Sequence, residues 1–122
     1  MAEVIARHHA HDIIVPSSAG LTALGHVTDL TLKTLHANGY STVGLSSKPF
    51  RRETLKNFDL IINLTGDPHE REFAGTVKVD NWKVEDPYGQ EPDVYQRILE
   101  ELESRVLLLA GRLRTAHQKA RV

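Results

Sequence analysis

Cysteine is absent from the 122-residue chain. Its absence excludes disulfide scaffolds, cysteine-ligated zinc and iron–sulfur sites, thiol redox chemistry and any cysteine nucleophile. The sequence also has no apolar run of the roughly 18 residues that a membrane span requires. Its first residues, MAEVIARHHAHD, are charged and rich in histidine, without the apolar segment of a secretory signal. We therefore expect a cytoplasmic protein that makes no membrane contact.

An excess of one charge is lacking as well, because 15 basic and 16 acidic residues give a formal net charge of −1. A chain balanced in this way does not bind nucleic acid through its overall charge. The hydrophobic fraction of 40% is ordinary for a globular protein. A chain of this length buries enough surface to fold without disulfides or a metal. We expect a single domain over residues 1–122, with no cofactor.

Short β-branched or apolar runs alternate with helical patterns along the chain. The predicted strands cover residues 13–15, 58–64 and, as an edge strand, 76–79. The predicted helices cover residues 2–9, 26–38 and 51–57, and a long amphipathic helix begins near Pro92 and continues through Leu113. This alternation predicts an α/β fold of three layers, in which helices flank both faces of a mainly parallel sheet.

Three histidines near the N-terminus could bind a metal through their imidazoles. Only His8 and His11 are spaced to share a helix face, and His9 lies between them. The sequence places no carboxylate ligand beside them. We therefore interpret this region as a flexible, histidine-rich terminus that binds no metal.

The segment Asp86-Pro87-Tyr88-Gly89 precedes the last predicted helix. A carboxylic acid in a loop beside a pocket can protonate a departing alkoxide or phenoxide. The same residues are also ordinary turn formers, and spacing alone favours the turn. The segment 17–20, which follows a predicted strand, suggests a phosphate-binding loop. However, it lacks the glycine spacing and the lysine of a nucleotide-binding loop.

The order of five segments resembles the low-molecular-weight protein tyrosine phosphatases and their arsenate reductase relatives, over nearly the whole chain. In chain order, the segments are Met1-Ala2-Glu3 before a helix, Ser18-Ala19-Gly20-Leu21, Ser47-Lys48-Pro49-Phe50, Phe58-Asp59-Leu60-Ile61-Ile62, and Asp86-Pro87-Tyr88-Gly89 before a long helix. The resemblance implies the phosphatase fold of that family. It also implies that Asp86 stands at the general-acid position, that Tyr88 contacts substrate, and that Ser18 is a structural residue near the site.

Three positions depart from the family pattern, and the first of them removes its chemistry. Members of the family open with a strand and a Cys-x5-Arg phosphate loop, whereas this sequence begins at the Met that follows that loop. Thr65 stands where thioredoxin-coupled arsenate reductases carry a further redox cysteine, and Leu45 replaces a common histidine. The resemblance implies that relatives, or a full-length parent, hydrolyse aryl or tyrosine phosphates or reduce arsenate. We expect this chain, as given, to be inactive, with Asp86 vestigial.

Two origins for the missing loop remain open. In the first, the start codon is misassigned and the native protein is longer and active, which the retained Asp86-Pro87 favours. In the second, the truncation is natural and the chain is a pseudoenzyme that binds a partner or regulates a phosphatase. The losses at Leu45 and Thr65 favour this second origin.

A different class of function is a small cytosolic interaction protein that shares only its fold with the phosphatases. Basic residues near the C-terminus could then bind an acidic partner. These residues are Arg112, Arg114, Lys119 and Arg121. A solvated helix end whose cations match the helix dipole explains the same pattern more simply.

The resemblance places the missing strand between the predicted strands at 13–15 and 58–64. A sheet without an inner strand leaves buried backbone groups unpaired, at a cost of about 1–3 kcal/mol each. Either the strand at 13–15 shifts against the strand at 58–64, or a second chain covers the exposed edges. We expect a homodimer that involves residues 1–20.

Overall fold

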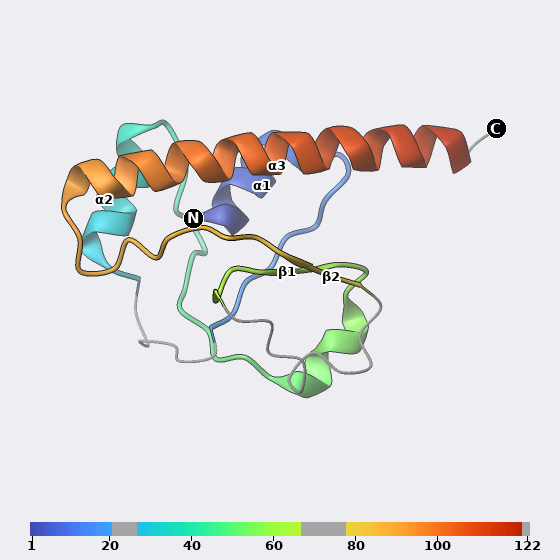
Figure 1. Cartoon of the computed structure of the whole chain (residues 1–122), viewed down its shortest axis with the longest axis horizontal. Coiled ribbons are helices and arrows are strands. Elements are labelled where there is room, and N and C mark those ends of the chain that lie inside the picture. Colours follow the sequence, from blue (N-terminus) through green and yellow to red (C-terminus); the bar gives the residue numbers. More distant parts are fainter. Residues whose placement is uncertain (21–26, 67–77, 121–122) are drawn as a thin grey trace.

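The computed structural model describes residues 1–20, 27–66 and 78–120 (Figure 1). Its elements, in chain order, are the helices α1 (Ala2–Ala10) and α2 (Asp29–Ala37), the 3-10 helix η1 (Arg52–Asn57), the strands β1 (Ile61–Asn63) and β2 (Val79–Asn81), and the helix α3 (Pro92–Ala120). β1 and β2 are parallel, with Ile61 opposite Val79 and Asn63 opposite Asn81. The chain therefore has the predicted α/β architecture of helices around parallel strands. Within the described ranges, no helix is long and apolar enough to cross a membrane.

α3 is the longest element, with 29 residues, or about 43 Å at the helical rise per residue. Pro92 occupies its first position, where the missing N–H costs no hydrogen bond, and Asp93 matches the positive end of the helix dipole. The structure confirms the predicted helical spacing of the apolar residues in this segment. The buried side chains along the helix are Tyr95, Ile98, Leu99, Leu102, Val106, Leu109 and Ala110. They form one face, which covers the rest of the fold.

The hydrophobic core lies where α1 packs against α3. Val4 and Ile5 of α1 join Leu35 of α2 and the buried face of α3 in one cluster. Trp82, which follows β2, closes the same cluster, and half-buried strand residues pack against it from the sheet side. In Figure 1, α1 and α3 lie on one side of the two strands and η1 lies on the other.

The predicted strand at 13–15 does not form. The N–H groups of Ile13 and Ile14 both donate to the carbonyl oxygen of Ala10, at 3.0 and 2.8 Å, so these two residues form a turn that ends α1. Val15 is exposed. The carbonyl groups in the last turn of a helix have no partner within the helix and need hydrogen-bond donors. Here the Ala10 carbonyl accepts the N–H groups that a strand at 13–15 would have used for pairing.

Parallel pairing by this segment begins later in the chain, at Gly20. The Gly20 N–H donates to the Lys48 carbonyl and the Phe50 N–H donates to the Gly20 carbonyl, both at 2.9 Å. This single bridge joins the segment to residues 48–50, and the described part of the sheet contains only β1 and β2. The alternative in which the strand at 13–15 shifts against residues 58–64 therefore has no support in the described residues.

Other element boundaries differ from the predictions by a few residues. α2 begins at Asp29, after Thr28 as its N-cap, and position 26 of the predicted helix lies outside the described residues. Of the predicted strand at 58–64, only the three residues of β1 form a strand. Only the end of the predicted strand at 76–79 is described, and β2 continues to Asn81. Gly39 has a φ of +82°, a conformation that glycine adopts without strain, and its N–H donates to the His36 carbonyl at 3.1 Å.

Candidate functional site

The loop that carries Asp86 runs from the end of β2 to the start of α3. Asp86 Oδ1 accepts a hydrogen bond from the Tyr88 N–H at 3.0 Å, which is the geometry of an Asx turn. The Gln90 N–H donates to the Pro87 carbonyl at 2.9 Å and closes the next turn. Asp86 and Tyr88 are both exposed. The Asp86 carboxylate therefore shapes the loop, as expected from turn chemistry.

An ion pair fixes this loop to the helix that follows it. Arg97 Nη2 lies 3.1 Å from Glu85 Oε2, and both side chains are more than half exposed. Exposed pairs of this kind contribute about 0–1 kcal/mol to stability. The loop is thus tied down beside Asp86 without being buried.

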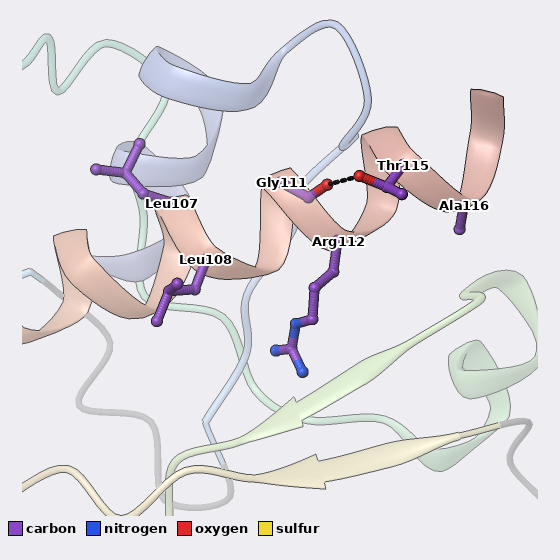
Figure 2. Close-up of a pocket in the computed structure, with 6 residues that line it drawn as sticks. All are labelled: Leu107, Leu108, Gly111, Arg112, Thr115 and Ala116. Carbon is purple, nitrogen blue, oxygen red and sulfur yellow. Dashed lines mark hydrogen bonds between the residues drawn. The ribbon is translucent and has the colours of Figure 1, made fainter. Parts of the chain in front are cut away.

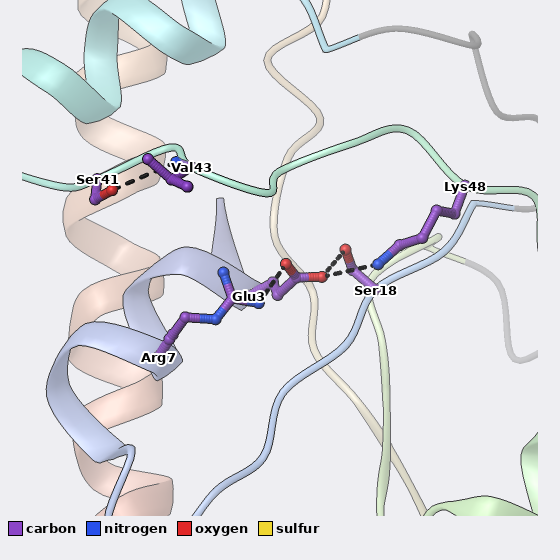
Figure 3. A network of polar contacts seen from close by, with 6 residues as sticks. All are labelled: Glu3, Arg7, Ser18, Ser41, Val43 and Lys48. Atoms are coloured by element: carbon purple, nitrogen blue, oxygen red, sulfur yellow. Dashed lines mark hydrogen bonds and ion pairs between the residues drawn. The ribbon is translucent and has the colours of Figure 1, made fainter.

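Ser18 belongs to a different polar cluster, centred on Glu3 of α1 (Figure 3). The Glu3 side chain is only 2% exposed. Its Oε1 accepts a hydrogen bond from Ser18 Oγ at 2.7 Å and a longer one from Lys48 Nζ at 3.4 Å. Its Oε2 accepts from Arg7 Nη2 at 2.8 Å. One buried carboxylate therefore joins α1, the segment after it and the loop that contains Lys48.

Two opposing effects set the pKa of Glu3. Burial raises it, while the hydrogen bonds from Ser18 and Arg7 and the charges of Lys48 and Arg7 lower it. The lowering effects win, so the pKa of Glu3 lies below its ordinary value. Burial also lowers the pKa of the Met1 amino group, and the Glu3 carboxylate partly offsets that shift.

A third polar cluster lies at the carboxyl ends of the two strands. Asn63 is buried, and its Nδ2 donates to Asn81 Oδ1 at 2.7 Å. Asn63 Oδ1 accepts from the Thr65 N–H at 3.1 Å and from Thr65 Oγ1 at 2.8 Å. The carboxyl ends of parallel strands are where ligands commonly bind in α/β proteins. Asn63 and Asn81 were missed from the sequence, where the only signal was an amide at the end of an apolar run.

The predicted site residues do not come together as one constellation. Among the described residues, no hydrogen bond or ion pair joins Ser18 to Asp86 or to Tyr88. Thr65, at the position of the family's redox cysteine, uses its hydroxyl to orient Asn63. Amide and hydroxyl groups of this kind can hold a ligand, but they do not attack phosphorus or arsenic without a base to activate them.

The histidines near the N-terminus are ordered, so the prediction of a flexible terminus was wrong. His8 and His9 lie in α1, and the His8 and Tyr40 rings meet edge to face with centroids 5.1 Å apart. His9 Nε2 lies 2.9 Å from the Tyr40 hydroxyl, which itself donates to Glu103 of α3. Because that hydroxyl has one hydrogen, His9 is the donor to it. These histidines therefore pack α1 against α3, and the described residues contain no cluster of ligands suited to a metal.

The basic residues expected to form a C-terminal patch are divided between different settings. Arg114 donates to both carboxylate oxygens of Asp12, each at 2.8 Å, and to the His9 carbonyl at 3.0 Å. The Arg114 guanidinium lowers the pKa of Asp12 to about 2. Arg112 is exposed, and Arg121 lies outside the described residues. Arg114 thus ties the end of α1 to α3 and is not available to an acidic partner.

Comparison with known proteins identifies the family that this geometry belongs to. The family model for low molecular weight phosphotyrosine protein phosphatases matches residues 1–119. Arsenate reductase 1 of Bacillus cereus is 30% identical over 110 residues, which cover 87% of this chain and 80% of that protein.

Two solved structures share the fold. A protein tyrosine phosphatase aligns with a TM-score of 0.80 at 21% identity, covering 93% of this chain and 85% of its own. An arsenate reductase in the reduced state aligns with a TM-score of 0.78 at 24% identity, covering 92% of this chain and 86% of its own. At these identities the likeness is one of fold.

Proposed function

The chain belongs to the low molecular weight phosphotyrosine protein phosphatase family, and from that premise we propose that it is a cytoplasmic protein of phosphatase fold that, by itself, neither hydrolyses phosphate esters nor reduces arsenate. One observation carries this proposal: the chain contains no cysteine. By the family resemblance, both reactions begin with attack by a cysteine thiolate, whose product is stabilised by a ring of amides and an arginine. Without the thiolate, the first bond does not form.

Ser18 and Glu3 are the pair that most nearly imitates a nucleophile and its base. Ser18 Oγ lies 2.7 Å from a Glu3 carboxylate oxygen, within reach for proton transfer. However, Arg7 and Lys48 bind the same carboxylate, and the pKa of Glu3 is lowered. A lowered pKa makes the carboxylate a weaker base, so the pair supports structure and not catalysis.

Asp86 retains the position of a general acid but has no reaction to serve. Its carboxylate accepts the Tyr88 N–H in an exposed loop. Proton donation to a leaving group accelerates a reaction only when a nucleophile is attacking at the same time. What supports a binding or regulatory role is the retained helical core of the fold, with its long helix and its exposed apolar side chains.

A second candidate function follows from the retained Asp86-Pro87 pair. A longer polypeptide that also contained a Cys-x5-Arg loop would be an active phosphatase or arsenate reductase, with Asp86 as its general acid. The DNA upstream separates the two proposals. An in-frame Cys-x5-Arg sequence supports the active parent, and an early in-frame stop excludes it.

The assay that tests the first proposal uses this 122-residue chain as purified protein. We expect turnover of an aryl phosphate, and reduction of arsenate with a thiol reductant, at the rate of buffer alone. Asp86→Ala and Tyr88→Ala should leave that background unchanged. Turnover above background that is equal in the natural chain and in both variants would indicate a contaminating enzyme. Turnover above background that Asp86→Ala abolishes would overturn the proposal.

A further inference from the structure

The two ends of α3 differ in what lies against them. The outer face of its C-terminal half is open, because the residues that line its pocket all belong to α3 itself (Figure 2). Its N-terminal part instead meets the end of α2 (Figure 1). There, Asn38 Nδ2 donates to Gln96 Oε1 at 2.7 Å, and Gln96 Nε2 donates back to Asn38 Oδ1 at 3.0 Å. This reciprocal pair of amides ties α2 to α3.

Asn38 also ends α2. Its Nδ2 donates a second hydrogen bond, to the Thr34 carbonyl at 2.7 Å. The Tyr40 N–H donates to the Leu35 carbonyl at 3.0 Å, and together with the bond from the Gly39 N–H to α2 it completes a Schellman motif. This motif favours glycine at position 39, where φ is +82°. The end of α2 therefore places a glycine directly after an asparagine.

An asparagine followed by glycine is prone to lose its side-chain amide in water, because glycine has no side chain to hinder its backbone nitrogen. The Gly39 nitrogen gives up its proton to solvent and attacks Cγ of Asn38, so that a new N–C bond closes a cyclic imide. The bond between Cγ and Nδ2 breaks, and the amide nitrogen takes up a proton and leaves as ammonia. Water then opens the ring at either carbonyl carbon and gives aspartate or isoaspartate. Water is the only other reactant.

We propose that Asn38 is a deamidation site whose reaction is slow while the contact between α2 and α3 is closed and fast when it opens. The proposal is independent of whether the protein has catalytic activity. Ring closure requires the Asn38 side chain to turn toward the Gly39 nitrogen. In the closed contact, three hydrogen bonds hold that side chain on Thr34 and Gln96, and the Gly39 N–H is bonded to α2. Local opening releases both reacting groups.

The product does not remake the contact. Deamidation replaces the Nδ2 donor by an acceptor oxygen, which then faces the Thr34 carbonyl and Gln96 Oε1. Turning the Gln96 amide over only exchanges which pair of oxygens is opposed, and it breaks the 3.3 Å hydrogen bond from Gln96 Nε2 to Glu100. The new negative charge also lies at the C-terminal end of α2, the negative end of the helix dipole. Conversion of Asn38 therefore releases the end of α2 from α3.

Incubation of the purified chain in mildly alkaline buffer, followed by proteolysis and mass spectrometry, measures the reaction at Asn38. Gln96→Ala removes two of the three hydrogen bonds and should raise the rate in buffer about fivefold or more. Gln90→Ala is the matched control, because Gln90 is exposed and its side chain bonds to no described residue. It should react at the rate of the natural chain.

The same three proteins in concentrated urea separate the site from its protection. All three should react at Asn38 at one common rate, which exceeds the rate of the natural chain in buffer. An Asn38 that does not react in urea would overturn the site. A natural chain that reacts equally fast in buffer and in urea, or a Gln96→Ala variant no faster than the natural chain in buffer, would overturn the protection by the contact.

Asn38→Asp tests what the modification does to the fold. Amide hydrogen exchange in α2 should be about fivefold or more faster than in the natural chain, while exchange in α1 stays the same. Asn57→Asp is the matched control, because Asn57 is exposed at the end of η1. It should leave exchange in α2 unchanged. Unchanged exchange in α2 of Asn38→Asp would contradict the release of α2 by deamidation.

Discussion

α3 and β1 bury their apolar side chains in different ways. α3 carries a continuous buried face over several turns, and Leu99 on that face is 0% exposed. β1 has three residues, of which Ile61 and Ile62 are only half-buried. The helix closes its own backbone hydrogen bonds, whereas the strand obtains them from β2. The helical half of the molecule, made of α1, α2 and α3, therefore contributes most of the stability of the fold. The strand half, made of β1 and β2, is where the family's chemistry would lie, and its stability depends on the helical half.

The largest effect is expected from a cavity in the helical half. Leu99→Ala should lower the free energy of unfolding by about 2–5 kcal/mol, because it removes a buried side chain that neighbours cannot replace. Ile62→Ala is the matched change in β1 and should cost clearly less, since that side chain is only half-buried. Urea unfolding followed by circular dichroism compares the two. Equal losses would contradict the claim that the helical half contributes more to stability than the strand half.

An intermediate effect is expected at Glu3, which connects α1 to the segments beyond it. Glu3→Gln should lower the free energy of unfolding at neutral pH by about 1–3 kcal/mol, because Arg7 and Lys48 lose a buried charged partner. Glu53→Gln is the control on the exposed side of η1 and should change little.

The pH dependence of this difference follows from the lowered pKa of Glu3. Its ordinary value is 4.5 and its folded value is lower, so the stabilisation is complete above pH 4.5. It is lost as the pH falls through the folded pKa, when the carboxylate becomes protonated. The gap in stability between the natural chain and Glu3→Gln should therefore close under acid. A gap that widens with acidification would show that the charge of Glu3 is not what stabilises the cluster.

The smallest effect is expected in the loop after β2. Asp86→Ala removes one hydrogen bond to the Tyr88 N–H from an exposed turn. The free energy of unfolding should change by no more than about 0.5 kcal/mol, the usual range for surface substitutions. Thermal unfolding measures it. A loss as large as that of Glu3→Gln would mean that the loop supports the core.

The sequence predicted α3 because a helix depends on spacing within a few residues, and Pro92 and the apolar period are both local signals. It predicted the strand at 13–15 wrongly, because a β-branched run does not specify its partner. In the structure, the Ala10 carbonyl takes the N–H groups of Ile13 and Ile14. The turn formed by Asp86 and Tyr88 was predictable because its hydrogen bond spans two residues.

The polar clusters could not be predicted in the same way. Asn63 and Asn81 are eighteen residues apart and meet only because β1 and β2 pair in parallel. Glu3 is an acidic residue in the first turn of a helix, a pattern that usually indicates an exposed side chain. Its burial depends on Ser18 and Lys48, which the fold brings to it from different segments.

The central claim is that the chain keeps the phosphatase fold without the chemistry that binds and attacks a phosphate. Titration of inorganic phosphate into the isotope-labelled chain, followed by amide chemical shifts, tests it most directly. We predict dispersed signals from α1 and α3 and only weak, non-saturating shifts elsewhere, because the chain has no cysteine loop and the Thr65 N–H and hydroxyl at the end of β1 are already bonded to Asn63. A saturating response at sub-millimolar phosphate, confined to residues 17–20 or to Thr65 and Asn81, would contradict the claim.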